Sequence, residues 1–237
     1  MTVFVLVPGA WHGAWSWDLL VPELERRGHA ALAVDLPCDD PRATFADYAR
    51  VVCAAIPAGV DDAVLVGHSL GGHSVARAAA QRRVARAVYL CGLVPEVGRS
   101  MLDQARDRDG MLLPAYLAGL GPTDADGRRV WVDEQVARDI MYPDCTGAVA
   151  RWAFTQLRPQ ANAPYAEPCP PIDLRATPST YVLATDDLLV EPAWSRRTAA
   201  RLGADLVEIP GGHSPALARP AELADVLVAA AAAGSAG

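Results

Sequence analysis

Lysine is absent from this sequence of 237 residues, because all 21 basic side chains are arginines. A mechanism that needs a lysine, such as Schiff-base formation or proton transfer by a side-chain amine, is therefore excluded. Together with the many alanines, the missing lysines indicate the coding bias of a GC-rich bacterial genome. The absence thus limits the chemistry without indicating what that chemistry is.

Clusters of positive charge and long apolar runs are missing as well. The net charge is −7 and the arginines are scattered, which argues against a nucleic-acid-binding face and against binding to an anionic membrane. The longest apolar run, 226–233, is too short to cross a bilayer. The five cysteines are odd in number and form no CxxC pair, and no signal peptide precedes Val3. We therefore expect free thiols and a cytoplasmic protein.

Short, continuous apolar runs alternate with helical patterns along the chain. The expected strands are 2–7, 30–34, 63–66, 86–90, 179–184 and 205–209. The expected helices are 17–27, 44–56, 70–82, 193–202 and 217–231. Apolar runs without polar alternation are typical of parallel strands that are covered on both faces. The order predicts an α/β fold with a mostly parallel, six-stranded, doubly wound sheet and right-handed crossovers.

One interval, 95–177, breaks this alternation because it contains no clear strand and is rich in proline, charged residues and isolated aromatics. About 80 residues is far too long for a simple crossover loop. We therefore predict an α/β core of residues 1–94 and 178–237 and a mostly helical cap insertion of residues 95–177. The cap should lie over the carboxyl edge of the sheet, where open α/β sheets bind ligands.

The segment GHSLG, residues 67–71, has the pattern G-x-S-x-G between an expected strand and an expected helix. In this context the pattern indicates a tight turn that holds Ser69 in strained geometry above the sheet edge. The flanking glycines allow close approach, and the helix N-terminus favours a developing negative charge. A glycine-rich turn with a capping serine is the alternative. The context favours Ser69 as a nucleophile and His68 as a packing residue, since neighbours in a sharp turn point in different directions.

A second Gly-His-Ser sequence, residues 212–214, follows the last expected strand on a glycine-rich loop. From this loop His213 can reach Ser69, and an imidazole that titrates near neutrality suits a general base. A solvated loop histidine is the alternative, but the position after the last strand favours the base. The third group should be a buried carboxylate that orients the imidazole, located between the serine and the histidine in the chain. Asp186 and Asp187 both meet this requirement, and the residues alone do not separate them.

Another glycine-rich loop follows the first expected strand, within residues 5–18. An oxyanion that develops at an acyl carbon needs two N–H donors, one from the residue after the nucleophile and one from such a loop. The first donor is Leu70, and the second is Ala10, because Gly9 frees the backbone to turn inward. The alternative is an ordinary strand-to-helix connection. For His12 we favour a hydrogen bond to the backbone over a place in the pocket.

These segments together resemble the α/β-hydrolase family, and more narrowly its branch of plant methylesterases and hydroxynitrile lyases with their bacterial esterase relatives. The matching stretches are GAWHGAWSW (9–17), GHSLGG (67–72), LRPQ (157–160), YVLATDDLLVEP (181–192) and GGHSPALARP (211–220). In this family the acid comes three residues after a small residue at the strand end and before a hydrophobic pair. The resemblance therefore favours Asp187 over Asp186. It also supports the remaining site residues, which are Ser69, His213, Ala10 and Leu70.

Two departures from the family pattern bear on the reaction. Pro8 and Gly9 replace the usual histidine–glycine pair before the oxyanion residue, which affects the loop rather than the triad. The lyases of this branch use a lysine just after the catalytic histidine and a threonine in the oxyanion loop, where this chain has Ser214 and Ala10. The resemblance therefore disfavours cyanohydrin cleavage.

The leading expectation is a serine hydrolase that cleaves small to medium apolar carboxylic esters through an acyl-enzyme. We expect no cofactor and no metal ion, and a small-molecule ester as the partner rather than nucleic acid or a membrane. Two alternatives keep the triad, namely a lyase or acyltransferase on the same fold and a ligand-binding, receptor-like protein. The sequence leaves open whether the protein is a monomer or a homodimer and which acyl and alcohol groups it takes.

Overall fold

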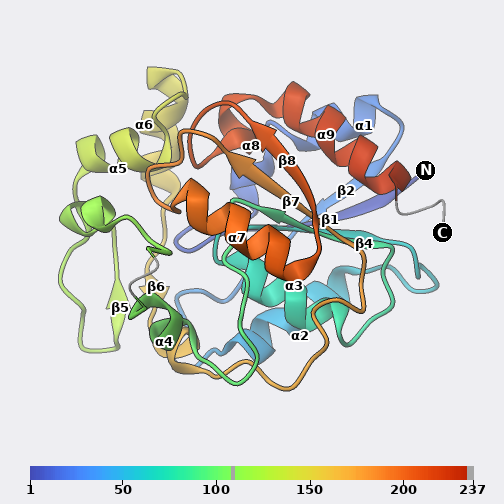
Figure 1. Ribbon diagram of the computed structural model, residues 1–237. Helices are drawn as coiled ribbons and strands as arrows, with labels where there is room; N and C mark the ends of the chain where they lie inside the picture. The colour runs from blue at the N-terminus through green and yellow to red at the C-terminus, as the bar shows by residue number, and fades with distance from the viewer. Residues whose placement is uncertain (108–109, 234–237) are drawn as a thin grey trace.

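The computed structural model describes residues 1–107 and 110–233, and a six-stranded sheet between two layers of helices forms its centre (Figure 1). The strands lie in the order β2-β1-β3-β4-β7-β8, and every neighbouring pair is parallel. Their bounds are β1 Val3–Val7, β2 Ala30–Ala33, β3 Val64–His68, β4 Arg86–Leu90, β7 Ser179–Ala184 and β8 Asp205–Ile209. The predicted α/β fold with a parallel six-stranded sheet is confirmed.

Apolar side chains of the central strands feed two cores, one on each face of the sheet. β3, β4 and β7 are buried along their whole length, whereas the edge strands β2 and β8 keep exposed positions. One core packs beneath α2 Phe45–Ala55, α3 Gly71–Ala79 and α7 Pro192–Leu202. The other packs beneath α1 Val21–Arg26 and α9 Pro220–Ala233. Burial on both faces is the reason that the strands read as unbroken apolar runs.

Prolines shorten or divide two of the expected helices. The expected helix 17–27 becomes a 3-10 turn, η1 Ala14–Trp17, followed by α1, whose first turn accommodates Pro22 because no hydrogen bond is needed there. The expected helix 217–231 becomes α8 Pro215–Ala218 and α9, because Pro220 lacks the N–H that would continue α8. Arg219, which precedes this proline, leaves the helical region with φ −145° and ψ 57°.

The interval 95–177 contains short helices and, contrary to expectation, a small sheet. Its elements are α4 Met101–Ala105, η2 Pro114–Gly119, β5 Arg128–Arg129, α5 Glu134–Met141, α6 Gly147–Gln156, β6 Gln160–Ala161 and η3 Ala163–Ala166. β5 and β6 pair antiparallel and bring Arg129 opposite Gln160. Strands of two residues show no periodicity in the sequence, which is why the expectation of no strand was wrong here. Figure 1 shows α5, α6 and β5 grouped on one side of the molecule.

Trp11 joins this interval, which the sequence predicts to be a cap and which keeps that name below, to the rest of the chain through hydrogen bonds. Its indole Nε1–H donates to the Arg129 carbonyl at 3.1 Å, and its amide donates to Gln160 Oε1 at 3.4 Å. Its carbonyl accepts from the amide of Arg158 at 2.8 Å. The loop after β1 is therefore tied to both strands of the small sheet and to the segment beside it.

Within residues 1–107 and 110–233, none of the helices has the length and apolar character needed to cross a membrane. The five cysteines are all free thiols, as the sequence predicted. The cytoplasmic location stays a prediction of the sequence.

Candidate active site

Ser69 lies in the tight turn between β3 and α3, with its backbone in the left-handed region at φ 49°. Its amide donates to the Leu90 carbonyl at 3.0 Å, and its carbonyl accepts from the amides of Gly72 at 3.0 Å and Leu93 at 2.8 Å. A residue other than glycine seldom adopts a positive φ. Strain that the surrounding hydrogen bonds maintain is a common property of functional sites.

Close packing around the turn explains why glycines flank the serine. A Cβ on Gly67 would lie 2.8 Å from the backbone of Gly71, and a Cβ on Gly71 would lie 2.7 Å from the carbonyl oxygen of Pro8. The helix therefore begins directly against β3 and the loop after β1. This close approach is what the spacing of the glycines predicted.

His213 and Asp187 form a buried hydrogen-bonded pair. The Nδ1 atom of His213 lies 2.8 Å from Asp187 Oδ2, and the two side chains are 2% and 3% exposed. Because a carboxylate only accepts, Nδ1 carries the proton and Nε2 is left as an acceptor. The other carboxylate oxygen, Oδ1, accepts from the amides of Leu189 at 2.8 Å and Val190 at 2.9 Å. Three N–H donors thus fix the carboxylate against the imidazole.

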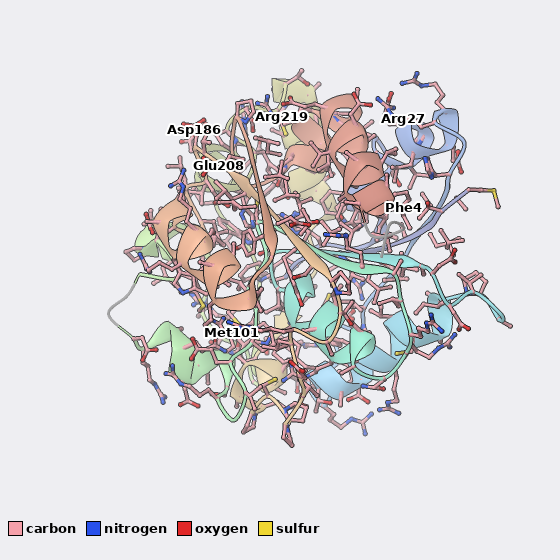
Figure 2. The ribbon with its side chains drawn as sticks, turned by 45° about the vertical axis from the view of Figure 1, so that its right-hand side comes forward. Phe4, Arg27, Met101, Asp186, Glu208 and Arg219 are labelled. Carbon is pink, nitrogen blue, oxygen red and sulfur yellow. The ribbon has the colours of Figure 1, made fainter. Side chains whose placement is uncertain are left out.

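Asp186, the other candidate acid, points away from His213. It is exposed, and Figure 2 shows it at the periphery of the molecule. Its Oδ2 atom accepts from the amide of Gly211 at 3.1 Å, and its own amide donates to the Gly211 carbonyl at 3.0 Å. Asp186 therefore braces the loop that carries His213, and only Asp187 meets the imidazole.

His68 connects the serine turn to the histidine loop. Its Nε2–H donates to the main-chain carbonyl of His213 at 2.8 Å, and the two rings have centroids 4.8 Å apart. The sequence indicated a packing role for His68, and the structure adds this hydrogen bond. No pattern in the sequence could have shown it, because the partner is a carbonyl oxygen 145 positions away.

Ala10 and Leu70 line the same cavity as Ser69. Neither N–H donates a hydrogen bond within residues 1–107 and 110–233. His12 donates from Nδ1 to the Ala10 carbonyl at 2.7 Å, and Tyr142 donates its hydroxyl proton to His12 Nε2 at 2.8 Å. The expected backbone hydrogen bond of His12 is present, whereas Tyr142 had no signal in the sequence.

A cavity of about 350 Å³ opens beside Ser69, at the small end of the range for small-molecule sites. Its apolar lining includes Leu93 and Leu189 from outside the interval 95–177, and Met101, Leu102, Ala105, Leu112 and Leu120 from within it. Apart from Ser69, its polar lining comes from this interval and consists of Tyr116, Thr123, Arg129, Asn162 and Tyr165. The lining of the cavity is therefore mostly apolar, with a few polar side chains added by the interval 95–177.

One group of side chains could in principle hold a metal ion. Ligand atoms of Cys91, Asp187 and His213 lie within 4.8 Å of one another, the one such group in the part of the chain that the structure describes. Burial and the nearby Asp187 carboxylate raise the pKa of the Cys91 thiol well above its usual value, so it is a poor source of a thiolate ligand. The hydrogen bonds of Asp187 and His213 suit proton transfer better.

Known proteins share the features by which the sequence resembles the α/β-hydrolase family. A model of the alpha/beta hydrolase family matches residues 4–226. The chain belongs to this family. The turn at Ser69 and the pair of His213 and Asp187 thus occupy the ends of β3, β8 and β7 in an alpha/beta hydrolase.

Relatives of this alpha/beta hydrolase include named esterases and hydrolases. Esterase PIR7B from Oryza sativa subsp. japonica is 28% identical over 252 residues, covering 95% of this chain and 94% of the esterase. A pyrethroid hydrolase from Sphingobium wenxiniae is 28% identical over 249 residues, covering 96% of this chain and 86% of that hydrolase. The solved structure of methylesterase MES16 from Arabidopsis has a TM-score of 0.80 at 21% identity and covers 98% of this chain and 99% of that one. The two relatives that are 28% identical support a hydrolase, and the solved structure shows the shared fold.

Buried histidines should make the fold sensitive to acid. Burial lowers the pKa of His12 from 6.5 to about 4 and that of His68 well below 6.5. The unfolded chain therefore binds protons between pH 6.5 and 4 that the folded chain does not, so the free energy of unfolding falls as the pH falls. His12 alone should account for about 2 kcal/mol between pH 7 and pH 5. Urea midpoints at the two pH values measure this, and His12→Gln should reduce the difference. A difference that the substitution leaves unchanged would contradict the prediction.

Proposed function

We propose that this alpha/beta hydrolase is a cofactor-free serine esterase that cleaves small to medium apolar carboxylic esters. The observation that carries the proposal is the arrangement at the carboxyl ends of the strands. A strained serine lines a largely apolar cavity, and His213, which the buried Asp187 holds, contacts the ring of His68, the residue before that serine. This combination provides a nucleophile, a base and an orienting carboxylate in one place.

In the first half of the reaction, Ser69 Oγ attacks the acyl carbon of the ester while its proton passes to His213 Nε2. The hydrogen bond from Nδ1 to Asp187 leaves Nε2 free to accept this proton and stabilises the imidazolium that forms. The carbonyl oxygen gains the negative charge, and the amides of Ala10 and Leu70 would donate to it. The alcohol then leaves with the proton from His213, and an acyl-enzyme remains on Ser69.

In the second half, His213 takes a proton from a water molecule, and the resulting hydroxide attacks the acyl-enzyme. The same two amides receive the second oxyanion. Its collapse releases the acid and returns the proton to Ser69, so that the enzyme is restored. No step requires a group that the chain does not provide.

The lining of the cavity and the relatives support the choice of substrate. Leucine, methionine and alanine side chains surround the space next to Ser69, and such a surface gains free energy by removing an apolar group from water. The related esterase and pyrethroid hydrolase, each 28% identical, support an ester as the bond that is cleaved.

Hydrolysis in water labelled with heavy oxygen tests the proposal. A series of 4-nitrophenyl esters of increasing acyl length should be turned over, and each acid product should contain one oxygen atom from the solvent. An acyl group that appears only on an added alcohol would indicate an acyltransferase, and no turnover of any ester would contradict an esterase. A fluorophosphonate probe should label the folded protein once, and peptide mass spectrometry should locate the label at Ser69 rather than at Ser74 or Ser214.

A further inference from the structure

The cavity lining contains a set of polar side chains from the interval 95–177, here called the cap end, that have almost no partners among the described residues. The hydroxyls of Tyr116, Thr123 and Tyr165 and the side-chain amide of Asn162 take part in no hydrogen bond within residues 1–107 and 110–233. Arg129 makes one side-chain hydrogen bond, from Nε to the Gly121 carbonyl at 3.0 Å. Polar groups that face a cavity together without protein partners are the usual means by which a binding site fixes the orientation of a ligand.

The charge of Arg129 has no counterion. No carboxylate lies within ion-pair distance of it in the described parts of the chain, and the cavity lining contains no aspartate or glutamate. Its neighbour Arg128 differs, because it forms ion pairs with Asp124 at 3.0 Å and Asp126 at 2.8 Å. Of these two arginines, the one that lines the cavity is therefore the one without a counterion among the described residues.

Three contacts fix Arg129 in place. It lies opposite Gln160 in the pairing of β5 with β6, and its carbonyl accepts from the indole of Trp11 at 3.1 Å. Its Nε–H donates to the carbonyl of Gly121. The two terminal guanidinium nitrogens remain free to donate. They form a planar pair of donors, and this geometry matches the two oxygens of a carboxylate.

The surrounding side chains are neutral donors. Burial raises the pKa of Tyr116 and of Tyr165, against the opposing effect of the nearby Arg129 charge. Both phenols are therefore protonated at neutral pH and can donate to an anion. With one cation and only neutral neighbours, the cap end matches a single negative charge better than a doubly charged phosphate.

We infer that the cap end of the cavity binds a carboxylate at the far end of the substrate, with Arg129 as the residue that determines this specificity. The inference rests on the proposed esterase function and narrows it. The substrate would be an ester whose apolar middle lies along the leucines and whose distal end carries a carboxylate, such as a half-ester of a dicarboxylic acid. A cavity whose lining combines Ser69, a mostly apolar surface and one unpaired arginine suits this class of molecule.

Matched substrates test the inference. Monomethyl esters of dicarboxylic acids are compared with methyl esters of monocarboxylic acids of the same chain length, over a series of lengths. For the best length, the ratio of kcat/KM between half-ester and neutral ester should fall at least about tenfold in Arg129→Gln, mainly through a higher KM for the half-ester. Arg129→Lys keeps the charge but not the planar pair of donors, and should therefore retain only part of the preference. Arg128→Gln is the matched control, since its side chain pairs with aspartates outside the cavity, and its ratio should equal that of the wild type.

Two results would overturn the inference. One is an equal loss of kcat/KM for both substrates in Arg129→Gln with recovery of neither in Arg129→Lys, because that indicates a purely structural role. The other is a wild-type protein that does not prefer the half-ester at any length.

A binding measurement keeps this inference separate from the proposed function. Calorimetry with Ser69→Ala protein and a monomethyl dicarboxylate half-ester requires no turnover, and binding should weaken at least about tenfold when Arg129→Gln is added. Such Arg129-dependent binding without any ester hydrolysis by the unsubstituted protein would reject the esterase and keep the carboxylate site. Hydrolysis of neutral esters with no half-ester binding would reject only the carboxylate site.

Discussion

Replacing Ser69 with alanine should lower kcat for ester hydrolysis by a factor of about 10⁴ to 10⁶. The substitution removes the oxygen that attacks the acyl carbon, so no acyl-enzyme can form, and only binding and the two oxyanion amides remain to assist water. The hydrogen bonds that hold this turn join backbone atoms and do not involve the side chain of Ser69. Alanine should therefore leave the left-handed backbone at this position unchanged. Initial rates with the best 4-nitrophenyl ester measure the effect.

The second Gly-His-Ser sequence provides the matched control for this experiment. The hydroxyl of Ser214 is buried and has no hydrogen-bond partner among residues 1–107 and 110–233, and Ser214 is not part of the cavity lining that contains Ser69. Ser214→Ala should therefore change kcat by less than about threefold, within the range of a substitution away from the machinery. Equal losses in the two variants, or a Ser69→Ala protein that keeps a tenth of the activity, would contradict Ser69 as the nucleophile.

Replacing Asp187 with asparagine should lower kcat by a factor of about 10³ to 10⁴. The amide oxygen can still accept from the amides of Leu189 and Val190, so the loop keeps its geometry. The amide nitrogen would then face His213 Nδ1 as a donor, which favours the tautomer with the proton on Nε2. In that tautomer Nε2 cannot take the proton of Ser69. The loss should therefore appear in kcat, while the melting temperature changes little.

Asp186 is the neighbouring control for this second experiment. Asp186→Asn has the same chemical change one position earlier in the chain, on a side chain that is exposed and bonded to Gly211. Its kcat should stay within about threefold of the wild type, as for other surface substitutions. A large loss of kcat in Asp186→Asn together with a small loss in Asp187→Asn would show that the loop has a different arrangement during catalysis.

Some parts of the site were predictable because they depend on residues close together in the chain. The turn at Ser69 needs glycines at fixed offsets, so a few letters between a strand and a helix are enough to indicate it. The order of strands and helices follows from apolar runs in the same way. The choice between Asp186 and Asp187 is different, because adjacent residues point to opposite sides and only the path of the loop decides which one is buried. Residues alone left it open, and the resemblance favoured the residue that the structure places against His213.

Other parts could not be predicted because they depend on contacts between distant segments. Tyr142 meets His12 across 130 positions, and a tyrosine in an irregular stretch gives no sign of such a partner. The small sheet of the cap is formed by two pairs of residues that are too short to show a period. For the same reason no pattern in the sequence indicated a role for Arg129, because that role depends on the cavity it lines and on the absence of a counterion among the described residues.

The hydrogen bonds between Trp11 and the cap make activity on heating or in denaturant depend on the stability of the cap. Trp11 follows Ala10 directly and is held by Arg129, Gln160 and Arg158, so a partial opening that frees the cap also releases the backbone next to the amide proposed to bind the oxyanion. Proteins commonly open in such sub-global units at a lower free energy than the whole fold requires. Enzyme turnover should therefore cease at lower urea concentrations than those that melt the central sheet. The temperature and urea concentration at which turnover ceases are therefore set by the least stable cooperative unit that contains Trp11. Substitutions that stabilise the cap should raise both limits even when the core is unchanged.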